Sequence, residues 1–405
     1  MSVGKYLEGV GTSGIYANTN PTSRMPQTTP PFGPAGVTRN WTDANGNFQP
    51  DCNLLSPDAQ DLRVSGGDLC GVLSNVSFGT NVLTNDFDAS LLSGWGHRPS
   101  DWNLAVSIQQ QIGKRASLDV TYSRRSFRGF AVADNRSLQS SDLTPFSIVA
   151  PLDSRLPEGG GYVVQGLYDV VPGKAGQVDN FITDSARYGD WYQYFNGIDV
   201  TVEARVRGRF TFAGGTSTGQ TVADNCAVRQ RLPELATTTT GTTAFGAGLM
   251  TSAVTPVSPY CHVAFGVLTY ARGLSSYLVP KLNLEVAATF QSKPGPLLSA
   301  NYAAPNSVVS PSLGRDLSGN AATVTVNLVA PGSLYGDRIN QLDLRLAKVF
   351  DSGRYRTVVG ADIYNALNSN AVLTYNNTFV PDGPWLQPLA VLTPRLIKFT
   401  AAFDW

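Results

Sequence analysis

Amphipathic segments of about nine to eleven residues recur along this chain, and in each of them apolar and polar positions alternate. Side chains alternate across a β-strand, so the pattern predicts strands with one apolar and one polar face, and helical spacing fits none of them. The clearest segments are 102–112, 117–127, 198–206, 282–290, 342–346, 355–363 and 396–405, whereas the alternation in 264–277 is blurred.

The connections between these segments differ sharply in length. Short turns follow positions 112, 206, 277 and 350, whereas the stretches 128–190, 222–263, 293–337 and 366–394 are long. All short turns then fall at one end of the strands and all long loops at the other. Transmembrane β-barrels have this asymmetry, with short periplasmic turns and long extracellular loops, whereas a soluble sandwich mixes the two. The loop segment 151–174 contains an apolar run that predicts a small hairpin above the membrane.

The predicted fold is all-β, an antiparallel transmembrane barrel portion of about ten strands, if 2–9 is the first. The last strand ends at Trp405 with no polar tail, which suits a barrel strand whose aromatic end lies at the membrane interface. In a soluble protein the same apolar strand would be an exposed edge that could pair with another chain. We expect outer-membrane lipid around the strands and the barrel-assembly machinery at this terminal strand. The chain contains no run of about 18 apolar residues, so the sequence predicts no membrane-spanning helix.

Charge adds little to this picture. The formal net charge is zero, which gives no electrostatic case for nucleic acid. Charged residues of both signs fall on the polar faces of the strands, where we expect them to pair across the lumen wall because charge facing lipid is costly. They are Asp119, Asp199, Glu203, Arg205, Lys281, Glu285, Asp343, Arg345 and Asp362.

Four cysteines lie in two local pairs, Cys52 with Cys70 and Cys226 with Cys261, and none has the spacing of a zinc site. Both pairs lie in loop-like stretches, so we expect two disulfides and an oxidising compartment. Reduced, half-buried thiols are the alternative. The opening residues MSVGKYLEGVGT lack a signal peptide, so the chain is expected to begin inside a longer polypeptide.

Several stretches carry a family resemblance. They are KYLEGVGTSGIYANTNPTSR, RNWTDANGNFQPDC, GWGHRPSDWNLAVSIQQQI and RINQLDLRLAKVFDSGRYRTVVGADIYNALNSNAVLTYNNTF, followed by the terminal strand. Together they resemble TonB-dependent outer-membrane receptors, in particular the Oar-like group with a carboxypeptidase-regulatory-like domain. The resemblance implies a 22-stranded barrel closed by a plug. Residues 1–405 would be the C-terminal barrel part, without plug or N-terminal strands, from a truncated or split gene.

The function that follows is TonB-dependent uptake of an unidentified ligand in the cell outer membrane, with TonB engaged only through the missing plug. A self-contained small porin or surface adhesin without a plug is the alternative. A secreted soluble β-protein that binds glycans is a third hypothesis, and it predicts a second sheet packed on the first. We expect no enzymatic activity. The G-x-S-x-G match at 215–219 is followed by polar loop instead of a helix, and only His97 and His262 could serve as its base.

One calcium site and one set of ligand-binding residues are candidates. Asp43, Asn45, Asn47 and Asp51 offer oxygen ligands at alternating positions, although an Asx-rich turn explains the same residues. We expect no other cofactor. Trp191, Tyr192, Tyr194 and Phe195 favour an aromatic girdle over a stacking platform for a sugar or peptide, and Arg124, Arg125 and Arg128 form a basic group at a strand end. The ligand-binding candidates are Trp191, Phe195, Arg124 and Arg128.

Overall fold

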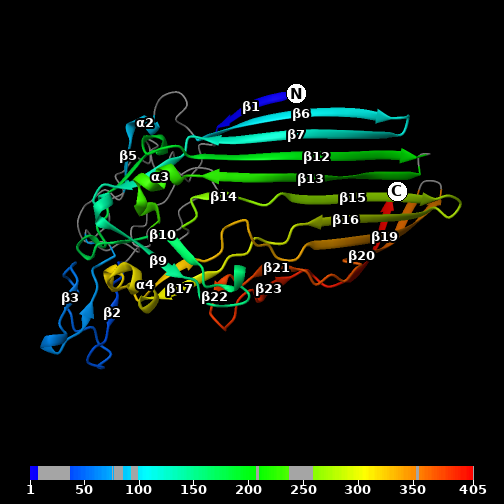
Figure 1. The fold of residues 1–405 in the computed structure, drawn as a ribbon. Coiled ribbons are helices and arrows are strands. Elements are labelled where there is room, and N and C mark those ends of the chain that lie inside the picture. The colour runs from blue at the N-terminus through cyan, green and yellow to red at the C-terminus, as the bar shows by residue number, and fades with distance from the viewer. Residues whose placement is uncertain are drawn as a thin grey trace.

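The computed structural model describes residues 1–7, 37–74, 76, 85–92, 99–206, 209–236, 259–352 and 355–404. Ten strands of the described chain follow one another in a single antiparallel sheet, in sequence order (Figure 1). They are β1 (Ser2–Leu7), β6 (Ser100–Ile112), β7 (Ala116–Arg128), β12 (Tyr192–Val206), β13 (Phe210–Asp224), β15 (Leu268–Val279), β16 (Leu284–Lys293), β19 (Ile339–Ser352), β20 (Tyr355–Tyr364) and β24 (Leu396–Asp404). A short strand, β14 (His262–Ala264), pairs with the loop end of β13. Trp405 lies outside the described residues.

The register of the sheet places the predicted apolar positions in continuous rows on one face. Ile108 lies opposite Val120, which lies opposite Val200. At the other end of the sheet, Leu346 and Phe399 flank Ala361 in the same way.

Large apolar side chains on this face are exposed. Ile108 is 71% exposed, Leu346 49% and Phe399 81%, and no second sheet covers them in the described part of the chain. Contiguous exposed apolar surface of this extent marks contact with lipid or protein. Polar residues fill the opposite face, so the predicted all-β barrel portion is confirmed and the packed second sheet of the soluble hypothesis is absent from the described chain.

Two details of the strands differ from the prediction. The strand expected to include Lys281 and Leu282 begins at Leu284, and Lys281 lies in the preceding turn with φ of 68°. Pro280 explains the difference, because proline cannot donate to a ladder and ends the pairing there. Strand β12 begins at Tyr192 and runs for 15 residues, which is longer than a membrane crossing needs. Its first residues, at the loop end, therefore lie above the membrane.

The long connections fold into a packed layer at one end of the sheet, called here the cap (Figure 1). Its further strands are β2 (Trp41–Thr42), β3 (Gln60–Asp61), β4 (Leu69–Cys70), β5 (Asn85–Phe87), β8 (Ala131–Asn135), β9 (Leu143–Val149), β10 (Val163–Val170), β11 (Asn180–Asp184), β17 (Asn301–Pro305), β18 (Thr323–Asn327), β21 (Val372–Tyr375), β22 (Thr378–Phe379) and β23 (Pro388–Val391). Its α-helices are α2 (Ala89–Leu92), α3 (Cys226–Arg231) and α4 (Asn306–Leu313). Its 3₁₀ turns are η1 (Arg63–Ser65), η2 (Ser140–Asp142), η3 (Pro157–Gly159), η4 (Pro172–Lys174), η5 (Ser185–Arg187), η6 (Pro233–Ala236) and η7 (Ser318–Asn320). No helix in the described residues is long and apolar enough to span a membrane.

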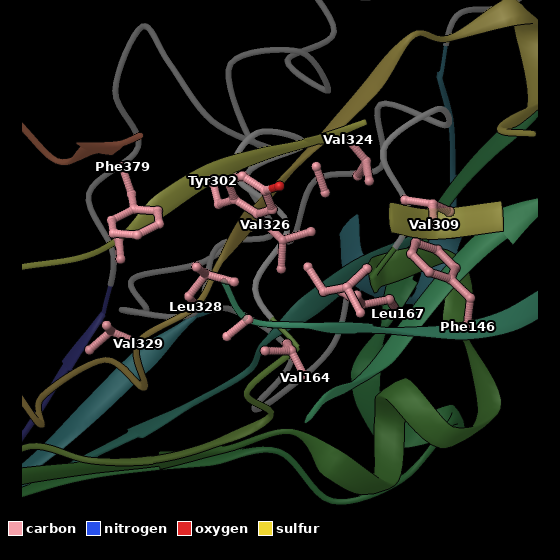
Figure 2. Packing of buried hydrophobic residues seen from close by; sticks show 14 of the residues in the cluster. Phe146, Val164, Leu167, Tyr302, Val309, Val324, Val326, Leu328, Val329 and Phe379 are labelled. Atoms are coloured by element: carbon pink, nitrogen blue, oxygen red, sulfur yellow. The ribbon is translucent and has the colours of Figure 1, made fainter. Parts of the chain in front are cut away.

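The largest core of the cap joins three loops that are far apart in sequence (Figure 2). Leu167 comes from the loop after β7, Val326 from the loop after β16, and Phe379 from the loop after β20, and each is at most 2% exposed. Burying one such side chain stabilises the cap by about 1.5–3 kcal/mol. The predicted hairpin is β9 with β10, but it begins at Leu143, before the expected position 151.

Ion pairs between loops add to this core. Arg315 Nη1 donates to Asp169 Oδ2 at 2.5 Å, which ties the loop after β16 to strand β10. Arg155 pairs with Asp153 and donates to the carbonyl oxygen of Gly383 at 2.8 Å, which ties the loop after β7 to the loop after β20. The cap is therefore one packed layer built from several loops.

We expect adjacent positions on β12 to differ in their access to water. A cysteine in place of Val200 should be protected from a membrane-impermeant maleimide in native membranes, because the side chain faces hydrocarbon. A cysteine in place of Thr201, on the opposite face, should be labelled. Equal labelling at both positions, with total thiol measured after solubilisation as the control, would contradict the assigned faces.

Candidate functional site

The inner, polar face of the sheet is hollowed beneath the cap. A groove of about 890 Å³ crosses the strands from β12 to β19. Its inward-facing polar lining consists of Asp199, Thr201, Ser217, Tyr270, Arg272, Thr289, Gln291, Lys293, Gln341 and Asp343. The register explains their convergence, because Thr201, Gly215, Arg272, Gln291 and Gln341 follow one another across five neighbouring strands.

Glycine at position 215 creates the recess in this wall. Gly215 lies between Thr201 on one side and Arg272 on the other, and it presents no side chain between them. A Cβ placed there would collide with the backbone carbonyl of Val200. The strands therefore approach closely at this point, and the arginine side chain has open space beside it.

Some charges of the inner face are already used within the wall. Arg345 Nη1 donates to Asp362 Oδ1 at 2.8 Å, which is the predicted kind of pair, but the other seven charges that were predicted to pair across the wall form no ion pair among the described residues. Asp343 Oδ1 accepts from the backbone nitrogen of Asn365 at 2.7 Å and from the side-chain Nε2 of Gln341 at 3.1 Å.

Other charges of the groove have no opposite charge within ion-pair distance. Among the described residues, Asp199, Arg272 and Lys293 make no salt bridge. A wall that pairs some charges and leaves one acid and two bases facing water suits a polar ligand, because its groups can complete those interactions.

A second hollow, of about 660 Å³, continues the groove toward the cap. It shares Ser217, Tyr270 and Lys293 with the first groove. Aromatic rings of Phe195, Phe265, Tyr270 and Tyr335 line it, together with Leu297 and Leu373. A ligand passing from the cap would meet rings first and charged groups deeper in the wall.

Phe195 is the one candidate ligand residue that lines this path. It points to the inner face, and its ring lies over the two glycines Gly197 and Gly219. A Cβ added at Gly197 would lie 2.6 Å from Phe195 Cζ, so the small residues make room for the ring. The platform hypothesis for Phe195 stays a prediction.

The girdle prediction is wrong for Phe195, which faces inward, and for Trp191. Its side chain is 8% exposed and stacks on Phe130, with ring centroids 4.8 Å apart, inside a core of the cap. The reason is position, since Trp191 precedes strand β12 and belongs to the loop layer. Tyr192 and Tyr194 do face outward, with ring centroids 6.2 Å apart.

Arg124 and Arg128 lie on the outward side of the sheet, away from the groove, while Arg125 between them points inward and binds Asp101 at 2.6 Å. Sequence reasoning missed Arg272 because the alternation in its segment is blurred. The two-residue period of β15 was the signal that could have identified it.

The residues of the calcium candidate form hydrogen bonds with one another and with neighbouring backbone amides in the structure. Asn45 Nδ2 and Asn47 Nδ2 donate to Asp51 Oδ2 at 2.5 and 2.7 Å, and Asp43 accepts from the backbone amides of Gly46 and Phe48. This is the arrangement of Asx-rich turns. No group of three or more acidic, histidine or cysteine side chains in the described residues could hold a metal ion. Calcium binding here stays a prediction.

Asp68, which the sequence did not single out, organises this loop. It is fully buried and accepts from Asp51 N at 2.8 Å, Trp41 Nε1 at 2.7 Å and Ala44 N at 2.9 Å. These donors, that of Asp51 foremost, hold the pKa of Asp68 below its ordinary value. The structure also joins Cys52 to Cys70, so a disulfide and a buried carboxylate secure the same segment.

The other disulfide joins Cys226 to Cys261, beside the loop end of β13. Asp224 Oδ1 accepts from Cys226 N at 2.9 Å, and its Oδ2 contacts His262 Nδ1 at 2.8 Å. Ser217 of the G-x-S-x-G match lies in the middle of strand β13, which continues to Asp224 without a helix. The strand–turn–helix of a nucleophile elbow is therefore absent at this serine. His97 lies outside the described residues.

Comparisons with known proteins add little. No family model matches the chain. No curated protein matches it either. Among solved structures, the chain is similar to the outer membrane transporter YddB from Escherichia coli, with a TM-score of 0.39 and 13% identity over 80% of this chain and 34% of that one. The chain thus spans about a third of that transporter's length.

We expect replacement of Arg345 by glutamine to destabilise the sheet by about 1–2 kcal/mol, because Asp362 loses its charged partner in the wall. The same change at Arg272 should cost less than about 0.5 kcal/mol, because no carboxylate depends on it. Urea unfolding, followed by gel mobility without heating, measures both. A larger loss at Arg272 than at Arg345 would contradict the assignment of Arg272 to the ligand groove.

Glu234 makes the cap sensitive to pH. Burial, with Asp134 nearby, raises the pKa of Glu234 from 4.5 to about 7. The folded cap therefore retains a proton that the unfolded chain loses, and stability falls as pH rises from 4.5 to about 7. The loss is at most about 3 kcal/mol. Thermolysin cleavage of the cap should accelerate over this range, and Glu234→Gln should remove the difference. Parallel pH profiles for both proteins would refute this role.

Proposed function

We propose that this chain is part of an outer-membrane transport barrel that takes up a polar ligand. The observation that carries the proposal is the groove on the inner face, with unpaired charges beneath a packed cap and an exposed apolar belt behind it. A barrel wall with lipid on one side and a lined passage on the other is suited to transport. Specificity would arise where the cap loops meet the wall.

The ends of the sheet support a larger barrel. Strand β1 pairs only with β6, and β24 pairs only with β20, among the described residues. Each strand therefore leaves one row of backbone donors and acceptors without a strand partner. Within hydrocarbon such groups cost several kcal/mol each, so an open edge requires a further strand. We infer that additional strands close the barrel.

The resemblance to TonB-dependent receptors supplies a candidate for the missing parts. That family has 22 strands and a plug in the lumen, and energy for uptake reaches the ligand through the plug. In this proposal the plug and the other strands belong to another part of the same protein or to a second chain. Residues 1–405 would then contribute the inner-face groove and the cap.

The ligand class follows from the lining of the groove. Arg272 and Lys293 favour negatively charged groups, Asp199 favours a positive group or a hydroxyl, and the amides of Gln291 and Gln341 bind either donors or acceptors. The aromatic hollow above would bind an apolar or ring-shaped part of the same molecule. We therefore propose a polar ligand with both charged and ring-bearing groups.

Photo-cross-linking at the two edges tests the proposal. A benzophenone amino acid at Gly4 on β1, and separately at Thr400 on β24, should cross-link to other barrel strands in outer membranes. The same residue at Val120, inside the sheet, is the control and should link only to its neighbours. A direct β1–β24 cross-link would overturn the proposal in favour of a self-contained small barrel.

A further inference from the structure

Three cations lie on the outward side of the sheet near its loop end. Lys5 lies opposite Trp102, Arg124 lies opposite Leu104, and Arg128 lies opposite Ser100. All share the side of the apolar rows described above. A cation on this side does not face the polar lumen. Its cost therefore depends on how deep it lies in the membrane, because a charge is costly within hydrocarbon and acceptable at the headgroups.

The depth of Arg124 matches the edge of the apolar belt, while Lys5 and Arg128 lie two and four residues farther toward the loops. From Leu104 to Ile112, at the turn end of β6, the strand rises about 27 Å at roughly 3.4 Å per residue. With a tilt of about 40°, this covers about 20 Å of membrane thickness, close to the height of the apolar band of a barrel. Arg124 therefore lies at the level where hydrocarbon gives way to headgroups.

The contacts of these cations are aromatic instead of acidic. The guanidinium carbon of Arg124 lies 4.9 Å from the centre of the Tyr194 ring, and Nη1 donates to Asn196 Oδ1 at 3.4 Å. Lys5 Nζ lies 6.0 Å from the centre of the Trp102 ring. Within the described chain, no carboxylate lies within ion-pair distance of Lys5, Arg124 or Arg128.

The neighbouring charges on both faces are satisfied by other groups. Arg125, one residue from Arg124, faces inward and binds Asp101 at 2.6 Å. The carboxylate on the outward rim, Asp224, contacts His262 at 2.8 Å and Tyr192 at 3.3 Å. The three outward cations thus retain positive charge at the lipid boundary, with donor capacity for an external anion.

We propose that Lys5, Arg124 and Arg128 bind the phosphate groups of a glycolipid in the outer leaflet of the membrane. This inference rests on the proposed placement of the chain in an outer membrane. Phosphate oxygens would complete charge-assisted hydrogen bonds with guanidinium and ammonium groups, and the acyl chains would lie on the apolar rows below. Lys5 and Arg124 lie two strands apart and two residues apart along the strands, about 12 Å between their backbones, which allows one lipid bearing two phosphates to reach both.

The test uses the protein extracted from outer membranes into detergent micelles, together with any strands that complete its barrel, and folding is verified by a heat-dependent shift in gel mobility. The probe is bisphosphorylated lipid A, with phosphatase-treated lipid A and inorganic phosphate as comparisons, and binding is measured by native mass spectrometry. We expect the triple variant K5Q/R124Q/R128Q to bind the bisphosphorylated lipid at least about tenfold more weakly. The matched control R125Q, which alters the inward neighbour, should bind within about twofold of the original chain.

The outcomes separate this inference from the proposed function. Loss of binding only in the triple variant, with no binding of the phosphatase-treated lipid, supports a phosphate site for lipid. Equal loss in R125Q, undiminished binding of the treated lipid, or full displacement by equimolar inorganic phosphate overturns it. An extracted protein that shows no heat-dependent shift counts against the membrane barrel itself, and this inference fails with it.

Discussion

The structure depends on one constraint, which is that backbone polar groups within a membrane must find their partners inside the protein. The ten-strand ladder meets it continuously from β6 to β20, where each strand has neighbours on both sides. Once the ladder is fixed, the two-residue period of a strand assigns every side chain to lipid or lumen. The exposed row that includes Ile108 and Phe399, and the polar groove that includes Arg272, are two consequences of the same register.

The cap follows a different physical principle. Its loops bury apolar side chains against one another as a soluble domain does, and the members of its largest core come from three separate connections. The Arg315–Asp169 pair and the hydrogen bond from Arg155 to the carbonyl oxygen of Gly383 join separate connections, and each of the two disulfides closes a loop within one connection. In the proposed function, the packed cap would hold the upper hollow in one shape, and the rings of Phe195 and Tyr335 would contact the ligand there.

The sheet could be predicted from sequence, and so could the two disulfides and a hairpin of the cap, whereas the packing of the cap core could not. Alternation is a local property, so positions such as Val200 and Leu344 reveal their face within a few residues of chain. The cap core gathers side chains such as Leu167, Val326 and Phe379, which are separated by long stretches of chain and carry no common period. Trp191 illustrates the limit, because its neighbours Tyr192 and Tyr194 belong to the ladder while it packs in the cap.

The candidate site was predictable in the same uneven way. Asp199 and Asp343 were placed on the inner face by parity alone, and both line the groove. Arg272 was not identified, because the residues around it on β15 are small on the lipid side: Ala271, Gly273 and Ser275 stand where apolar side chains would have marked the period. Hydropathy read strand by strand therefore fails for a strand whose lipid-facing residues are small.

Adjacent arginines show how the wall sorts charge. Arg124 and Arg125 have the same chemistry and neighbouring positions, yet one lies over a tyrosine ring at the lipid boundary and the other binds a carboxylate inside. The inward arginine finds its partner within the chain, because Asp101 lies diagonally across from it on the same face of the neighbouring strand. Among the described residues the outward one contacts a tyrosine ring and an amide, and in our proposal lipid phosphates supply its negative partner. A charge that the fold leaves unpaired on a lipid-facing row is thus informative about the lipid itself.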